Sequence, residues 1–198
     1  MKGMLVRPEL NQAIREGRKL VTRRLGGLKE INKEPDRWME VSPQNNATDV
    51  LFTDKYHYGI WVKPRYRVRE VVYVKEAWAH RVNIGVDYEV VYYKLNGSNI
   101  GDLKWRSPLF MPEWAARTFI QITGVRAERL QDITEEEAIA EGMTGLLYQK
   151  ATGALLTCAR DVFQWYWDSI NPNQKWASNP WVFRYSFVLQ NKGGVRNE

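Results

Sequence analysis

The chain of 198 residues has little of what several classes of protein depend on. Its single cysteine, Cys158, excludes an internal disulfide framework and a zinc site built from cysteines. With only two histidines, His57 and His80, a histidine-rich metal centre is disfavoured, and we expect neither a metal nor another cofactor. The sequence has no glycine-rich phosphate loop and no Ser-His-Asp set with a suitable base. The base of any catalysed reaction would therefore be a lysine or a carboxylate.

Long apolar runs are missing as well. No stretch approaches the roughly 18 consecutive apolar residues that a membrane-spanning helix needs. The N-terminus lacks the apolar segment of a secretory signal. We therefore expect no membrane partner and a cytoplasmic location.

The chain is instead rich in positive charge and in aromatic rings. The formal net charge is +6 and the isoelectric point is near 9.4, which favours anionic partners such as nucleic acid or a nucleotide-like ligand. Nine tryptophans and ten tyrosines can stack on nucleobases, or they can fill the core of a small barrel. The composition leaves both interpretations open.

Hydrophobic periodicity predicts three helices. The first covers residues 8–16, with a proline in its first turn and a glycine just beyond its end. The second is short: Thr134 and Glu137 form a capping-box pattern, in which each side chain would bond the other residue's backbone amide, and Gly142 would end the helix. The third covers about residues 157–170, where apolar side chains recur at helical spacing.

Runs rich in β-branched and aromatic residues predict the strands. They cover residues 20–24, 71–78, 88–93, 118–130 and 181–189, the fourth being one long strand or two strands broken at Gly124. Residues 26–57 are polar and rich in turn-forming residues, so we expect weak structure there. Many strands with three helices indicate an α+β fold, most simply a mostly antiparallel, partly open β-barrel with short helices at its rim. We expect one domain over residues 1–190, with insertions near 26–57, 96–116 and 143–157, and a frayed tail at 191–198.

Residues 17–24 form the most basic segment. Arg18, Lys19, Arg23 and Arg24 lie within seven positions, and the hydroxyl of Thr22 interrupts them. Such a segment is either a solvated strand edge that resists aggregation or part of a binding site.

Two further places carry charge where it is costly. Lys75 and Glu76 lie inside an apolar strand pattern that ends at Trp78, so they either face water or pair with partners in a pocket. Glu141 lies at the end of the short capped helix, where the helix dipole is mildly unfavourable for a carboxylate. That residue is either solvated or held in place for a task.

Taken in order, these segments resemble the ASCH family of the PUA-like superfamily, and most of all the larger ASCH proteins of phages and prophages. The matching motifs are Arg7-Pro8, Gly17-Arg18-Lys19-x-x-Thr22, Val74-Lys75-Glu76-x-Trp78, Ser107-Pro108-x-x-Met111-Pro112, Ile133-Thr134-Glu135-Glu136-x-Ala138-x-x-Glu141-Gly142 and Trp176-x-x-Asn179-Pro180-Trp181-Val182. The usual Gly-Asp of the family before the central strand is replaced by Arg69-Glu70. The resemblance implies a small PUA-like β-barrel with helices beside a cleft.

The resemblance also implies two functions. Family members are thought to bind RNA or other nucleic acid. The corresponding cleft would be basic and lined by aromatic rings, with contacts from Arg18, Arg23, Arg24, Lys75, Glu76 and Trp78. A branch of small bacterial members hydrolyses N4-acetylcytidine with a lysine, a threonine and a glutamate, which Lys19, Thr22 and Glu141 match here. We therefore carry forward a nucleic-acid or modified-nucleoside binding protein and, as the alternative, an amidohydrolase. A phage accessory protein that uses the fold for protein contacts is the third hypothesis.

Overall fold

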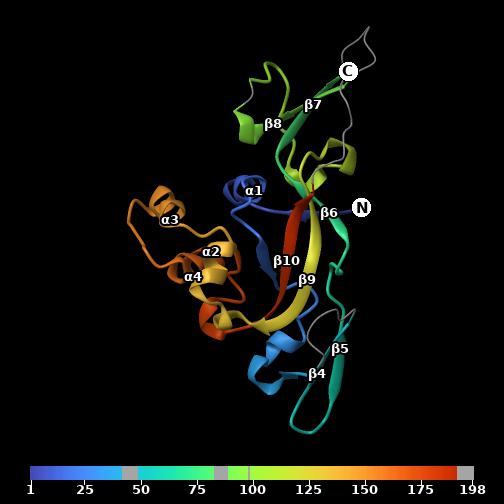
Figure 1. Cartoon of the computed structure of the whole chain (residues 1–198), viewed down its shortest axis with the longest axis vertical. Coiled ribbons are helices and arrows are strands. Elements are labelled where there is room, and N and C mark those ends of the chain that lie inside the picture. The colour runs from blue at the N-terminus through green and yellow to red at the C-terminus, as the bar shows by residue number, and fades with distance from the viewer. Residues whose placement is uncertain (42–48, 83–88, 98, 191–198) are drawn as a thin grey trace. The chain divides into compact units, whose positions relative to one another are not determined.

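The structure, a computed structural model, describes residues 1–41, 49–82, 89–97 and 99–190. Over this part of the chain it is an α+β protein with four α-helices and mostly antiparallel strand pairing. The largest sheet has the strand order β1-β6-β9-β10-β2 (Figure 1). Its strands are β1 (Lys2–Leu5), β6 (Val71–Lys75), β9 (Phe119–Arg129), β10 (Trp181–Gln190) and β2 (Val21–Arg24). β1 pairs with β6 in parallel, whereas the β6–β9 and β10–β2 pairs are antiparallel.

The chain divides into two compact units, and β9 and β10 contribute residues to both. The first unit contains the described parts of residues 1–17, 71–121 and 189–198. Besides β1 and β6 it holds α1 (Pro8–Arg15) and the hairpin of β7 (Trp78–Val82) and β8 (Glu89–Tyr93). Its core combines rings from β6, β7 and the start of β9 with smaller apolar side chains from the segment before β9: Tyr73, Trp78, Phe119, Met111, Ala115 and Ala116.

The second unit contains the described parts of residues 18–70 and 122–188. It holds β2, the small antiparallel sheet of β3 (Met39–Glu40), β4 (Val50–Thr53) and β5 (Gly59–Val62), and most of β9 and β10. Its helices are α2 (Glu135–Ala140), α3 (Gly145–Thr152) and α4 (Ala159–Ile170), and α2 packs against α4 (Figure 1). Phe183, Tyr185 and Phe187 are buried at alternate positions of β10, as the period of a strand requires.

Single-turn 3-10 helices connect these elements. They cover Ile31–Lys33, Pro35–Arg37, Lys94–Asn96, Pro108–Phe110, Glu113–Ala115, Leu130–Asp132 and Trp176–Ser178.

All three predicted helices are confirmed. α1 starts at Pro8, buries Leu10, Ala13 and Ile14, and is followed by Gly17 with a φ of 73°. A positive φ is accessible to glycine at low cost, which explains why the helix stops there. α4 buries five residues at the predicted spacing and starts two residues later than expected.

The strand predictions fail mainly where the chain bends or where pairing partners are far apart. The run predicted as one strand over 71–78 divides into β6 and β7 at residues 76–77, and β7 then pairs with β8. The run predicted over 118–130 forms one unbroken strand, β9, from Phe119 to Arg129. We expected weak structure over 26–57, but its described part contains β3 and β4, and β4 pairs with β5 beyond that range. The insertion at 143–157 contains α3, a helix that its weak amphipathic pattern did not predict.

Several sequence-based expectations extend beyond what the structure describes. Residues 42–48 of the first insertion, residue 88 of the predicted 88–93 strand and the tail at 191–198 lie outside the described residues. Within the described ranges, the strands form open sheets of five, three and two strands and close into no barrel. No helix in this part of the chain is long and apolar enough to cross a membrane.

Candidate active site

Lys19 and Glu141 meet in the second unit although 122 positions separate them in the sequence. The Lys19 Nζ donates hydrogen bonds to the Glu141 Oε2 at 2.5 Å, to the Glu141 backbone oxygen at 2.8 Å and to the Val21 backbone oxygen at 2.8 Å. The Leu20 amide bonds the Ala140 oxygen at 2.8 Å, which ties the start of β2 to the end of α2. Lys19 is 2% exposed and Glu141 is 3% exposed, so the pair is buried.

Two effects act in opposite directions on the proton of Lys19. Burial lowers the pKa of Lys19 from its ordinary value of 10.5, because a desolvated ammonium is disfavoured. The charge of Glu141 and its hydrogen bond oppose that shift, while Arg24 and Arg23 add to it. The three acceptors match the three N–H donors of a protonated lysine. Burial is the largest effect, so the pKa moves down.

Arg23 holds the other side of the Glu141 carboxylate. Its Nη1 lies 3.3 Å from Glu141 Oε1, its Nε donates to Glu128 Oε1 at 2.6 Å, and its Nη2 donates to Glu137 Oε2. The side chain of Arg23 has no exposed surface. A buried guanidinium needs such partners, because an isolated charge in a protein interior is very costly.

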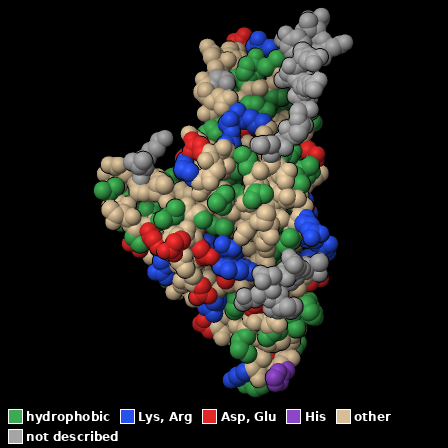
Figure 2. All heavy atoms as spheres, viewed as in Figure 1, with side chains coloured by type: hydrophobic (Ala, Val, Ile, Leu, Met, Phe, Trp, Pro, Cys, Tyr) green, Lys and Arg blue, Asp and Glu red, His purple; other side chains and the backbone are tan. Residues whose placement is uncertain are grey.

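Two further arginines extend this network toward the surface. Arg126 donates to Glu128 Oε2 at 2.6 Å and to Glu137 Oε1 at 2.7 Å. The Nε of Arg184 lies 3.1 Å from Glu137 Oε1. Figure 2 shows acidic and basic side chains together over α2 and the neighbouring strands of the second unit. We call Arg23, Arg126, Arg184, Glu128, Glu137 and Glu141 the Arg/Glu network.

Strand and helix periodicity explains why these six side chains meet. Arg126 and Glu128 are two apart on β9 and so share a face, and Arg23 lies opposite Arg184 in the β2–β10 ladder. Glu137 and Glu141 are four apart at the end of α2, which places them on one side of that helix. The predicted capping box is therefore only half formed. Thr134 accepts a hydrogen bond from the Glu137 amide at 3.2 Å, while the Glu137 carboxylate pairs with arginines.

Thr22, the third residue of the predicted catalytic set, is buried in β2. It lies opposite Tyr185 in the ladder, and strand alternation places its side chain on the other face of β2 from Arg23. Among the described residues, its hydroxyl makes no hydrogen bond to Lys19 or Glu141. The fold thus joins the lysine and the glutamate directly and leaves Thr22, three residues after Lys19, without a hydrogen bond to either.

The residues expected to bind nucleic acid are divided between the two units. In the second unit Arg18 is exposed and Arg24 is half-buried, whereas Arg23 is committed to three carboxylates. In the first unit Trp78 is buried and so presents no free ring face to a base. Lys75 donates to the Leu109 backbone oxygen at 2.7 Å.

Glu76, also in the first unit, is buried and paired. Its carboxylate accepts two hydrogen bonds from Arg117, at 2.8 and 2.7 Å, and the Arg117 guanidinium lies 3.8 Å from the centre of the Tyr93 ring. We expected the charges of the 74–78 motif either to face water or to pair with partners in a pocket. Glu76 is buried and paired, so the second alternative applies to it. The sequence did not identify Arg117 as the partner, because 41 positions separate the two residues and the pattern around 117 carries no periodic signal.

The first unit also presents an aromatic surface that sequence analysis missed. Trp114 is 54% exposed, and its ring packs edge-on against Trp78 and His80 at centroid distances of 5.6 and 5.2 Å. Phe110 is exposed nearby in the chain, and Arg106 lies over the Trp78 ring at 4.9 Å. Arg106, Phe110 and Trp114 belong to the predicted insertion near 96–116. The aromatic residues of this segment were the signal by which the sequence could have identified the surface.

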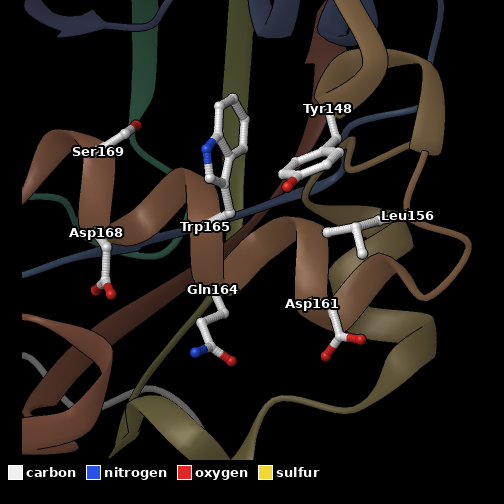
Figure 3. A pocket seen from close by; sticks show the side chains of 7 residues that line it. All are labelled: Tyr148, Leu156, Asp161, Gln164, Trp165, Asp168 and Ser169. Atoms are coloured by element: carbon white, nitrogen blue, oxygen red, sulfur yellow. The ribbon is translucent and has the colours of Figure 1, made fainter. Parts of the chain in front are cut away.

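An open hollow of about 530 Å³ lies along α4 in the second unit (Figure 3). Asp161, Gln164 and Asp168 project from the same side of the helix, and the Trp165 ring packs edge-on against Tyr148 of α3 at 5.1 Å. Leu156 and Ser169 complete the lining. The Ser169 hydroxyl donates to the Tyr166 backbone oxygen at 2.7 Å rather than to Asp161 or Asp168, so the hollow presents no nucleophile bonded to a base and is not the candidate active site.

No group of three or more His, Cys, Asp and Glu side chains is placed to hold a metal ion within the ranges that the structure describes.

In comparisons with known proteins, no family model, no curated protein and no solved structure matches the chain.

Proposed function

We propose that the protein is an amidohydrolase that removes an acyl group from N4-acetylcytidine or a related nucleoside. The observation that carries this is the buried contact of Lys19 with Glu141, two residues that the ASCH resemblance assigns to that reaction. An ASCH-type, PUA-like barrel and a cytoplasmic location belong to the same proposal. Binding through exposed charges finds less support at this site, because Arg23 is fully enclosed by carboxylates.

The chemistry assigns one task to each residue. The Thr22 hydroxyl oxygen attacks the acyl carbon, and its proton passes to the amine of Lys19 in its neutral form. When the C–N bond breaks, the leaving amine takes a proton relayed from Lys19, and Glu141 orients that lysine through its 2.5 Å contact. Water then attacks the acyl-threonine and releases the acid. A desolvated lysine with a lowered pKa suits this role, because it exchanges its proton nearer to neutral pH than a free lysine does.

Hydrolysis of N4-acetylcytidine tests the proposal, with cytidine and acetate measured by chromatography. We expect release of both by the wild-type protein and a loss of at least roughly 100-fold in Lys19→Arg, because arginine keeps the charge but does not act as a proton acceptor at neutral pH. Thr22→Val and Glu141→Gln should be similarly impaired. Lys33→Arg, a change in an exposed pair with Glu30, is the matched control and should be fully active.

Circular dichroism and thermal unfolding would establish that each variant is folded. A wild-type protein that leaves acylated cytidines intact, or a fully active Lys19→Arg, contradicts the proposal.

The second candidate function is binding of single-stranded nucleic acid by the aromatic surface of the first unit. Exposed Trp114, packed against His80 and close in sequence to exposed Arg106, provides the ring and the cation that bases and phosphates engage. Together with the net charge of +6, this surface favours an RNA or DNA ligand.

A further inference from the structure

The Arg/Glu network is balanced in charge, and Lys19 is the additional charge beside it. Three arginines face three glutamates, and every member lies within 3.3 Å of a member of opposite sign. Arginine stays protonated at all ordinary pH values, and each of the three glutamate side chains contacts at least one guanidinium. When Lys19 is protonated the seven groups carry one net positive charge, and when it is neutral they carry none.

We propose that the Arg/Glu network sets the protonation of Lys19, with Arg23, Glu128 and Glu137 acting as positioning residues through the Glu141 carboxylate. This proposal rests on the proposed function in one respect, namely that Lys19 is the residue that transfers a proton. The structural basis is the shared carboxylate. Glu141 Oε2 contacts Lys19 and Glu141 Oε1 contacts Arg23. Because only the Glu141 carboxylate lies between the two cations, a change in the charge around Arg23 should alter the protonation of Lys19.

The groups that act on Lys19 come from every element around it. Glu141 at the end of α2 favours the ammonium, while Arg23 and Arg24 of β2 disfavour it. Arg23 is in turn compensated by Glu128 of β9 and Glu137 of α2, and those two are compensated by Arg126 of β9 and Arg184 of β10. Charges interact over such distances because the centre of the network is buried, where the effective dielectric is lower than in water.

This arrangement predicts that removing the acidic and the basic member of the Arg126–Glu128 ion pair should move the pKa of Lys19 in opposite directions. Glu128→Gln removes a negative charge next to Arg23, so the uncompensated guanidinium should lower the pKa of Lys19 further. Arg126→Gln removes a positive charge that compensates Glu128 and Glu137, so the pKa of Lys19 should rise. We expect each midpoint to move by roughly half a pH unit or more. Arg126→Lys keeps the charge and should leave the midpoint close to the wild-type value.

The experiment is an NMR titration of full-length protein labelled with ¹³C at lysine Cε, with the Lys19 signal assigned from its absence in Lys19→Met. Arg37→Gln is the control. Arg37 is 45% exposed, as Arg126 is at 44%, and it pairs with buried Asp54 at 2.9 Å outside the network. It should leave the Lys19 midpoint unchanged. Arg126 is half-exposed, so its variants keep the test valid even if Glu128→Gln does not fold.

Opposite movements in Glu128→Gln and Arg126→Gln, with Arg126→Lys unchanged, support the proposal. Equal midpoints in all variants, or movement in the same direction in both, overturn it. The titration needs no substrate, so a protein that hydrolyses nothing would refute the proposed function and leave this test intact. Where hydrolysis is present, the acidic limb of its pH profile, along which activity rises as Lys19 loses its proton, should move with the Lys19 midpoint.

Discussion

At the scale of single residues, the interaction between Lys19 and Glu141 is the least replaceable feature of the second unit. Burying an ion pair costs desolvation on both sides, and the fold recovers this only through close contacts to both groups. Removing one partner leaves the other charge enclosed. Removing both should cost less than the two single changes added, because the direct contact between the two charges is then lost only once.

A double-mutant cycle checks this. We expect Lys19→Met to lower the free energy of unfolding by about 3 kcal/mol or more, and the double variant Lys19→Met/Glu141→Gln to lose less than the two single changes added. Urea denaturation followed by tryptophan fluorescence gives these values. Lys33→Met breaks a contact of similar length between two 63% exposed side chains and should cost well under about 1 kcal/mol. Additive losses at Lys19 and Glu141 would show that the two charges do not depend on each other.

At the scale of elements, α2 is a six-residue helix that carries Glu137 and is followed directly by Glu141, its C-cap residue. A helix this short gains little from its own hydrogen bonds and depends on its cap and its packing against α4. The Thr134 hydroxyl accepts the Glu137 amide at 3.2 Å and so satisfies one of the first free N–H groups. The N-cap of α2 therefore helps to hold the carboxylates that face Lys19 and Arg23.

Cap substitutions separate this role from general stability. We expect Thr134→Ala to lower the free energy of unfolding by about 1 kcal/mol, and Thr134→Ser to retain most of it. Thr144 caps α3 in the same way, through the Leu147 amide at 3.3 Å. Thr144→Ala should thus cost a similar amount, measured by thermal unfolding, while only Thr134→Ala reduces hydrolysis. Equal activity in the two alanine variants would mean that the α2 cap does not position the site.

At the scale of the whole molecule, the excess of six positive charges predicts affinity for polyanions that falls with salt. The sequence alone suggested phosphate contacts from Arg18, Arg23 and Arg24. Arg23 is buried among carboxylates, so it has no donor to offer a phosphate. The remaining arginines define the expected salt dependence, and the exposed Trp114 ring defines the expected stacking.

Fluorescence anisotropy with a labelled single-stranded oligonucleotide measures both. Arg18→Ala/Arg24→Ala should flatten the slope of log affinity against log salt by up to ~2 units, about one for each contact. Trp114→Ala should weaken binding by roughly 10-fold or more at one salt concentration and leave the slope unchanged. Lys33→Ala is the control for loss of an exposed charge in a salt bridge. Absence of binding at low salt would remove this candidate function.

Local patterns were sufficient for much of the architecture. Proline at the start of α1, glycine after it and the apolar spacing of α4 specify helices that need no distant partner to be recognised. The alternating aromatic residues of β10 specify a strand with one buried face. Lys19 was singled out by the basic segment that contains it and Glu141 by its place at the end of a helix, and the resemblance grouped them.

Other features depend on partners that are remote in sequence. β3 and β4 are short, and each exists because another strand lies beside it. The partners of Arg23 lie 105, 114 and 118 positions away, so no window of sequence shows that this arginine is enclosed by carboxylates. The same holds for Arg117 and Glu76.

The sequence by itself determined the α+β class, the principal helices and strands, and the basic segment that contains Lys19, because these follow from local spacing and composition. Only the tertiary structure decided which charges are neutralised. Ion pairs form between side chains that the sheet and α2 bring within about 3 Å, and burial then decides whether a charge is exposed to ligands or held by the protein itself. Arg23 is held by the protein itself, among carboxylates, and Lys19 is a buried amine paired with Glu141.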